Sequence, residues 1–98
     1  MQRIAVIAQL QPGSAEQAKR LIADGPPFDP ADLGLTGHDV YLGQTTVVFV
    51  FEGPDVERRV AELVNDPARS ASFSAWAPML AGPPTLARSA YHWAAAAS

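Results

Sequence analysis

The segment 36–52 constrains the fold of this chain more than any other part of the sequence. It contains two runs rich in β-branched and aromatic residues, His38–Leu42 and Thr45–Glu52, with Gly43-Gln44 between them. Runs of this composition favour β-strands. A two-residue connection that begins with glycine favours a type II′ turn, because glycine readily adopts the positive φ that this turn needs. The segment therefore predicts an antiparallel β-hairpin.

The predicted hairpin carries apolar side chains on both faces. Its turn pairs Leu42 with Thr45, and each later pair lies one residue further from the turn. One face then carries His38, Val40, Leu42, Val47, Phe49 and Phe51, and the other carries Asp39, Tyr41, Thr46, Val48 and Val50. An antiparallel sheet with one face in water shows a cleaner alternation of apolar and polar residues. We therefore expect both faces to be covered, one by helices and the other by a second copy of the sheet.

The residues before the hairpin predict one strand and one helix. Arg3–Leu10 is short, apolar and rich in β-branched residues, which is typical of a strand. Ser14 and Gln17 have the spacing of a capping box at the start of a helix, and Gly25 followed by two prolines ends that helix.

The residues after the hairpin predict a second helix and a last strand. Pro54 suits the first position of a helix. The buried stripe of this helix is expected to be Val56, Val60, Leu63 and Val64. Asp66-Pro67 repeats the start signal, so a further helical segment is expected there, which Pro78 should kink or divide. Thr85–Trp93 is expected to form the final strand.

The order of these elements is strand, helix, strand, strand, helix, strand. This order predicts an α+β ferredoxin-like fold, in which an antiparallel four-stranded sheet carries its helices on one face. The chain has 98 residues, which is enough for one such core. We expect residues 1–93 to form the single ferredoxin-like domain and residues 94–98 to be a flexible C-terminal tail.

The composition argues against several classes of function. The net charge is −3 and the seven basic residues are scattered, whereas nucleic-acid binding favours clustered positive charge. The apolar runs fall short of the roughly 18 residues of a membrane helix, and there is no signal-peptide pattern. The chain has no cysteine and lacks zinc-site spacing, a phosphate-binding loop and a dinucleotide fingerprint. We therefore expect a cytoplasmic protein without a cofactor or a metal ion.

Two stretches resemble a known superfamily. GHDVYL, followed by VVFVFEGPDVERRVAELVNDPARSASFSAWAPML, is similar in layout to the small actinobacterial polyketide cyclases and the SchA/CurD-like proteins of the dimeric α+β barrel superfamily. The resemblance implies a homodimer whose sheets form a barrel. It also implies an aromatic or polyketide-like small-molecule ligand. Superfamily members include cofactor-free monooxygenases, haem-handling enzymes and proteins without known activity, so the resemblance bears on fold more than on reaction.

Several polar side chains on the predicted strands are candidates for acid–base chemistry. Asp39 and Tyr41 share a strand face, and Thr46 lies opposite Tyr41 in the predicted register, so the three could orient a phenol or an enol and move a proton. His38 points to the other face. The alternative interpretation is a polar strand end near solvent, with Tyr41 in the core and His38 half exposed.

The last predicted strand and the segment before it supply the remaining candidates. Arg88 could hold an enolate oxygen, and His92, on the same predicted strand face, could act as general acid or base. An edge strand with solvated polar groups is the alternative. Phe73 and Trp76 stand at helical spacing, where they could line a pocket for a flat ligand or simply pack in the core. The barrel resemblance implies that the second strand of one copy approaches the fourth strand of the other.

Two functions of different class fit these observations. The first is a homodimer that binds an aromatic or polyketide-like molecule and cyclises it or oxidises it without a cofactor. The second is a non-catalytic ligand-binding or assembly module. An open pocket lined by the polar candidates would favour the first function, and an interior filled by side chains would favour the second. A haem-handling enzyme is a third possibility, supported only by the resemblance.

Overall fold

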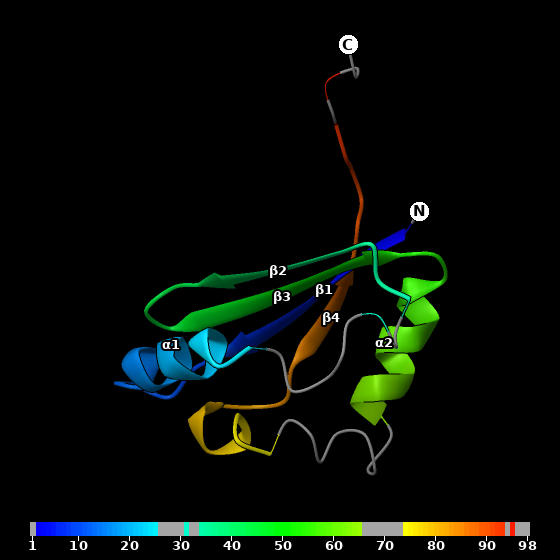
Figure 1. Cartoon of the computed structure of the whole chain (residues 1–98). Coiled ribbons are helices and arrows are strands. Elements are labelled where there is room, and N and C mark those ends of the chain that lie inside the picture. Colours follow the sequence, from blue (N-terminus) through cyan, green and yellow to red (C-terminus); the bar gives the residue numbers. More distant parts are fainter. Residues whose placement is uncertain (1, 26–30, 32–33, 66–73, 94, 96–98) are drawn as a thin grey trace.

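The computed structural model describes residues 2–25, 31, 34–65, 74–93 and 95. Figure 1 shows four strands and two α-helices in the order that the sequence predicts. The elements are β1 (Gln2–Gln9), α1 (Ala15–Ala23), β2 (Gly37–Leu42), β3 (Thr46–Gly53), α2 (Val56–Asn65), the short 3₁₀ helix η3 (Ala77–Met79) and β4 (Thr85–Arg88).

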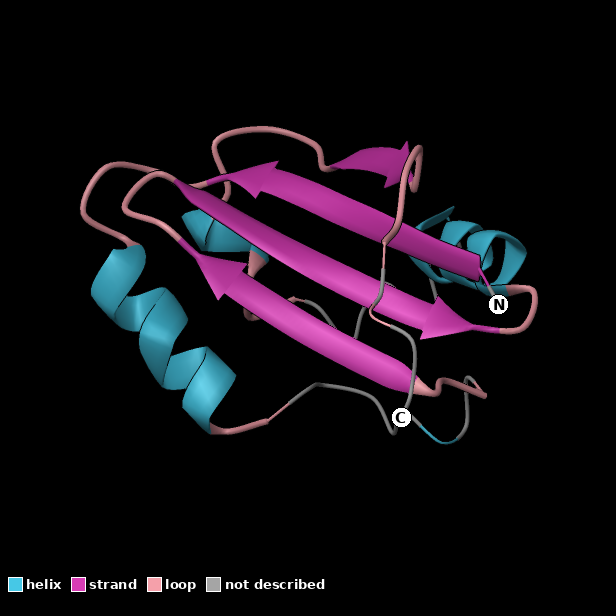
Figure 2. Cartoon of the chain, turned by 90° about the horizontal axis from the view of Figure 1, so that it is seen from above, coloured by secondary structure: helices cyan, strands magenta, loops and turns pink. Residues whose placement is uncertain are grey.

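The four strands form one antiparallel sheet in the order β2-β3-β1-β4. Both α-helices lie on the same side of this sheet (Figures 1 and 2). These features confirm the predicted ferredoxin-like α+β fold. We call the side without helices the open face. The register places its apolar side chains at Ala5, Ile7, Tyr41, Val48, Val50 and Ala87.

The β2–β3 hairpin exists, but its predicted register is wrong by two residues. Leu42 pairs with Val47, so the connection is centred on Gln44-Thr45. The backbone N–H of Gly43 donates to the Thr46 carbonyl at 2.8 Å, and Gly43 does not adopt a positive φ. The predicted register would pair His38 with Phe49, whereas the observed one pairs it with Phe51, on which its ring stacks. The connection between the last paired residues is therefore residues 43–46 rather than Gly43-Gln44 alone.

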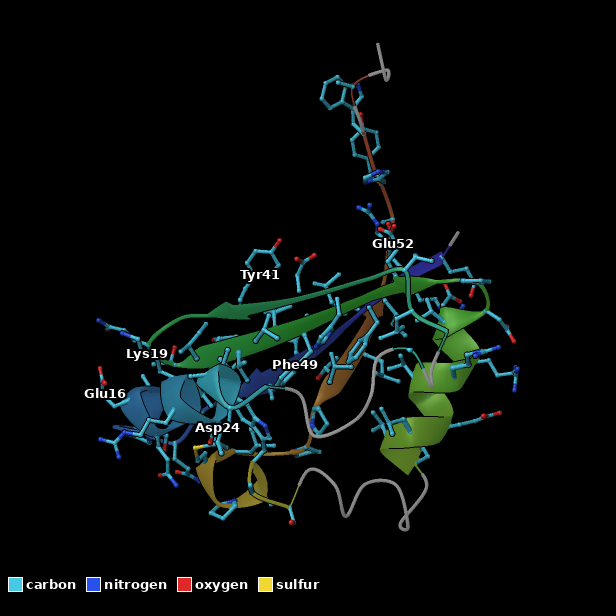
Figure 3. All side chains as sticks on the ribbon, viewed as in Figure 1. Glu16, Lys19, Asp24, Tyr41, Phe49 and Glu52 are labelled. Atoms are coloured by element: carbon cyan, nitrogen blue, oxygen red, sulfur yellow. The ribbon has the colours of Figure 1, made fainter. Side chains whose placement is uncertain are left out.

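The predicted faces of the hairpin survive this shift. Side chains alternate with a period of two, so a slip of two residues leaves each one on the same face. Figure 3 shows Tyr41 on the open face and Phe49 on the side of the helices. The partner of Tyr41 does change, from Thr46 to Val48.

Both helices form, with differences at their N-termini. Ser14 caps α1 as predicted, but its side chain makes no capping hydrogen bond. Helix α2 begins at Val56 rather than at Pro54. Asp55 has a φ of 58°, a left-handed conformation that aspartate tolerates better than most residues, so Pro54-Asp55 forms a turn before the helix. The side chain of Gln2 then accepts the Glu57 backbone N–H at 3.3 Å.

The last strand is shorter than predicted, because β4 ends at Arg88 rather than at Trp93. Arg88 pairs with Ile4, and β1 begins only two residues before Ile4. A longer β4 would therefore have almost no partner strand. Residues 89–93 leave the sheet and are exposed. This also removes the predicted division of these residues into two strand faces.

The connection between α2 and β4 is only partly described. The helical segment predicted from Asp66-Pro67 lies outside the described residues, except for its end. That end is the short helix η3, where Pro78 occupies one of the first two positions. Trp76 and Met79 are buried there, although the sequence patterns singled out only Trp76.

The core consists of two clusters beneath different ends of the sheet. In Figure 1, α1 lies under one end and α2 under the other. The first cluster contains Ala8, Leu10, Ala18, Val47, Trp76 and Met79. The second contains Ile4, Val6, Phe51, Val56 and Val60, which confirms much of the predicted stripe of α2. Phe49 packs against both clusters.

Leu63 provides a test of this packing. Its side chain is 5% exposed, so we expect Leu63→Ala to lower the free energy of unfolding by about 2–5 kcal/mol through lost burial and the space left behind. Chemical denaturation followed by circular dichroism measures this change. The neighbouring Glu62→Ala is the control, because Glu62 is exposed and its ion pair with Arg58 is worth about 0.5 kcal/mol or less. Equal effects of the two variants would contradict the assigned face of α2.

Candidate functional site

A pocket of about 260 Å³ lies on the helix side of the sheet. Its described lining residues are Val6, Ala8, Phe49, Phe51, Val60, Leu63, Val64, Ser74, Trp76, Ala77, Leu80 and Pro84. These residues come from both core clusters. The pocket therefore lies where the two clusters meet and fail to fill the space.

The floor of the pocket is buried and its rim is exposed. Strands β1 and β3 supply buried floor residues such as Val6 and Phe51, and α2 supplies Val60. Ser74 and Pro84 are exposed and form part of the described rim. Apart from Ser74, every described lining residue has an apolar side chain. The site is therefore suited to an apolar ligand, which it would take out of water.

Two aromatic side chains give the pocket a defined wall. The rings of Phe49 and Trp76 meet edge to face, with centroids 5.2 Å apart and an interplanar angle of 85°. Edge-to-face pairs of this kind add about 0.5–1.5 kcal/mol beyond the area that they bury. The structure thus places Trp76 where a ligand residue is expected. Phe73, the other predicted ligand residue, lies outside the described residues.

His38 points to the helix side but does not appear among the described lining residues. Its Nδ1 donates to the Val50 carbonyl oxygen at 2.9 Å. Its ring stacks on Phe51 with a centroid distance of 4.7 Å. Both contacts fix the imidazole at the β2 edge of the sheet, half buried. The half-exposed strand histidine is the interpretation that fits this position.

Asp39 and Tyr41 lie on the open face and are exposed in the single chain. Tyr41 is 61% exposed and faces Val48 across the hairpin. Thr46, predicted to complete this group, instead donates to Oε1 of Gln9 at 3.2 Å. The predicted trio is therefore not assembled as expected, because the register shift moved Thr46 away from Tyr41.

Arg88 and His92 do not share a face. Arg88 is paired with Ile4 on the helix side, and its Nε lies 3.5 Å from Glu57. His92 follows the end of β4, and its Nδ1 lies 2.6 Å from Nη1 of Arg3, a residue of the open face. Strands β2 and β4 occupy opposite edges of the sheet, as the predicted ferredoxin-like fold requires. Within one chain, the candidates on β2 and those near β4 are therefore far apart, and their meeting across a dimer remains a prediction.

A second, polar groove of about 470 Å³ lies between α2 and the β4 edge. Its charged side chains pair with one another. Arg58 binds Asp55 at 2.6 Å and Glu62 at 2.8 Å, and the hydrogen bonds that its guanidinium donates to Asp55 and then to Glu62 raise the pKa of Arg58. The charges in this groove are thus largely balanced at an exposed surface, which argues against a dedicated binding site.

Among residues 2–25, 31, 34–65, 74–93 and 95, no group of three or more His, Asp or Glu residues is arranged to hold a metal ion. None of the helices in the described part of the chain is long and apolar enough to cross a membrane.

Sequence reasoning identified part of the pocket wall and missed the rest. The stripe of α2 and Trp76 were predicted to face the sheet, and they do. Ser74 and Pro84 carried no signal, because a residue at a loop rim is recognisable only when the loop is placed against the sheet. Nothing in the residue pattern indicated that the two halves of the core would leave a space.

Comparisons with known proteins bear on the fold alone. No protein-family model and no curated protein matches the sequence. Among solved structures, the chain is similar to the NE2512 protein of Nitrosomonas europaea, a protein of unknown function. The two chains are 20% identical with a TM-score of 0.63, and the match covers 98% of this chain and 95% of the other. The likeness therefore supports a shared α+β fold and leaves the resemblance to polyketide cyclases without further support.

Proposed function

We propose that this protein binds an aromatic or polyketide-like small molecule in the pocket between its two core clusters. The pocket itself is the observation that supports the proposal. An apolar cavity of about 150 Å³ is enough to hold benzene. The larger volume of about 260 Å³ suits a ligand of two fused rings. The edge-to-face pair of Phe49 and Trp76 favours a flat ligand over a flexible chain.

The make-up of the pocket favours binding over catalysis. Proton transfer on a bound ring requires an acid or base within hydrogen-bond reach of it. The described wall supplies only the hydroxyl of Ser74, and none of the five predicted acid–base residues lies on it. We therefore favour the ligand-binding module over the cyclase or the cofactor-free oxygenase. The oxygenase and cyclase alternatives would require a polar group from outside the described wall of the pocket.

We further propose that the protein is a homodimer joined through its open faces. Ile7, Val48 and Val50 are half buried by their own strands, and neither α-helix of the described residues covers them (Figure 1). Tyr41 pairs with Val48 on the same face. Burying such a patch gains about 25 cal/mol for each Å² removed from water, and a two-fold axis lets the same surface cover itself.

Naphthalene is a suitable probe of the pocket, because its two fused rings match the volume. We expect it to bind and to alter the fluorescence of the protein, because Trp76 forms part of the wall. Val64→Phe should weaken this binding at least about tenfold, since the added ring occupies space at the rim. Fluorescence titration and isothermal calorimetry measure the affinity.

The matched control adds the same bulk one residue away. Asn65 is the next residue of α2 and is exposed, so Asn65→Phe should leave naphthalene affinity within about twofold of the original. Absence of naphthalene binding at its solubility limit would refute the proposed ligand class. An equal loss of affinity in both variants would show that naphthalene binds elsewhere.

A further inference from the structure

The C-terminal residues 89–93, here called the arm, project from the open face. Figure 1 shows the chain leaving β4 and rising away from the sheet, on the side opposite both helices. Tyr91 is 83% exposed and Trp93 is 72% exposed. Tyrosine and tryptophan side chains are enriched at protein interfaces, because each combines a large apolar ring with one polar group. The arm therefore presents two unburied aromatic residues beside an uncovered apolar face.

The base of the arm is held by a polar cluster on the open face. Arg3 pairs through Nε with the carboxylate of Glu52, its neighbour on β3. Nη1 of the same guanidinium lies 2.6 Å from Nδ1 of His92. The Ser89 backbone N–H also donates to the Arg3 carbonyl at 3.4 Å. Figure 3 shows Glu52 at the foot of the arm. Arg3 thus links the arm to the sheet and holds it in an orientation that points away from the open face.

The length of the arm matches a second layer packed on the open face. Stacked sheets lie about 10 Å apart. Five extended residues span up to about 17 Å. The aromatic end of the arm therefore reaches beyond a sheet stacked on the open face and can lie along its flank.

The open face by itself is smaller than the area that a stable protein–protein interface buries. Strand spacing and strand length give this face roughly 400 Å² per copy, or roughly 800 Å² for a facing pair. Stable protein–protein interfaces bury about 1,200–2,000 Å² in total. Tyrosine and tryptophan side chains bury about 150–250 Å² each. Two arms, each carrying Tyr91 and Trp93, supply the area that the sheets lack.

We propose that the arm of each chain docks on a second copy of the same chain, with Tyr91 and Trp93 resting against the flank of the partner's sheet. The inference rests on the proposed homodimer and specifies what stabilises it. Two-fold symmetry makes the contact reciprocal, so each chain both gives and receives an arm. The contact between Arg3 and His92 holds the base of the arm and directs the arm towards the partner.

Sedimentation equilibrium of the full chain tests this proposal. We expect the original protein to be a dimer, and the double variant Tyr91→Ala/Trp93→Ala to raise the dissociation constant at least about thirtyfold. The fold of the single chain should be unchanged, because both residues are exposed in it. Leu86→Ala is the control: Leu86 is an exposed apolar residue on the helix side of β4 and should leave the dissociation constant unaltered.

Fluorescence of Trp93 distinguishes docking on a partner from docking on the same chain. The difference between the spectra of the original protein and of Trp93→Phe isolates this residue from Trp76. We expect its emission to move to shorter wavelength as the protein concentration rises through the dissociation constant. A shift that is independent of concentration would overturn the proposal, since the arm would then bind its own chain.

The outcomes separate this proposal from the dimer on which it rests. A dimer that survives the double variant with an unchanged dissociation constant overturns arm docking and leaves the sheet interface standing. A protein that stays monomeric at about 100 μM overturns both. The ligand-binding proposal is judged independently, by naphthalene titration.

Discussion

Val48→Asp is expected to convert the proposed dimer into monomers, raising the dissociation constant at least about a hundredfold. Val48 lies on the open face and faces Tyr41 across the hairpin. A second sheet packed there would leave the new carboxylate without water or a partner, which costs several kcal/mol. Sedimentation velocity over a range of protein concentrations measures the change.

Two further variants check that charge at the interface is the cause. Gln44→Asp adds the same charge in the exposed hairpin turn and should leave the dimer intact. Val50→Lys places the opposite charge on the open face, and it should dissociate the dimer as Val48→Asp does. Circular dichroism establishes that each variant is folded. If folded Val48→Asp remained dimeric, the open face would not be the interface.

Trp76→Ala is expected to produce the largest loss of stability, about 3–5 kcal/mol in the free energy of unfolding. Trp76 is buried, packs edge to face on Phe49 and belongs to the first core cluster. Total stabilities of single domains are only about 5–15 kcal/mol, so this variant should be close to unfolding at room temperature. Urea denaturation followed by far-ultraviolet circular dichroism measures the loss.

The chain contains its own control for this prediction. Trp93→Ala removes the other tryptophan, which is exposed in the single chain. At protein concentrations below the dimer dissociation constant, it should change the free energy of unfolding by less than about 0.5 kcal/mol. A comparable loss in both variants would contradict the placement of Trp76 in the core. Trp76→Phe should retain the fold and bind naphthalene more weakly, because the wall becomes smaller.

The order and faces of the elements could be predicted because they follow from local patterns. The alternation along 38–51 fixed which side chains meet the helices, and a register error of two residues did not change this. The apolar spacing of Val56, Val60 and Leu63 likewise fixed the buried side of α2. Periodicity is a property of the chain itself, so it survives errors in turn type and in helix start.

The ends of elements were less predictable because they depend on partners. The sequence from Thr85 to Trp93 predicts an extended strand, yet β4 ends at Arg88. Arg88 pairs with Ile4, near the first residue of the partner strand β1. The helix signal at Pro54 was displaced in the same way, by the turn that carries the chain from β3 to α2. A local sequence pattern indicates which conformation a segment can adopt. The neighbouring strand or turn decides at which residue the element begins or ends.

The candidate site shows the same division more sharply. The sequence by itself determined which residues have the chemistry to bind a flat apolar ligand, and it pointed to Trp76 from its helical spacing. Only the tertiary structure decided that the polar candidates Asp39 and Arg88 point to opposite faces of the sheet and that a pocket remains between the two core clusters. A pocket is space left by elements distant in sequence, so its position depends on how helices of a given length cover a given sheet. The position of the pocket is therefore set by packing in three dimensions, and no local sequence pattern encodes it.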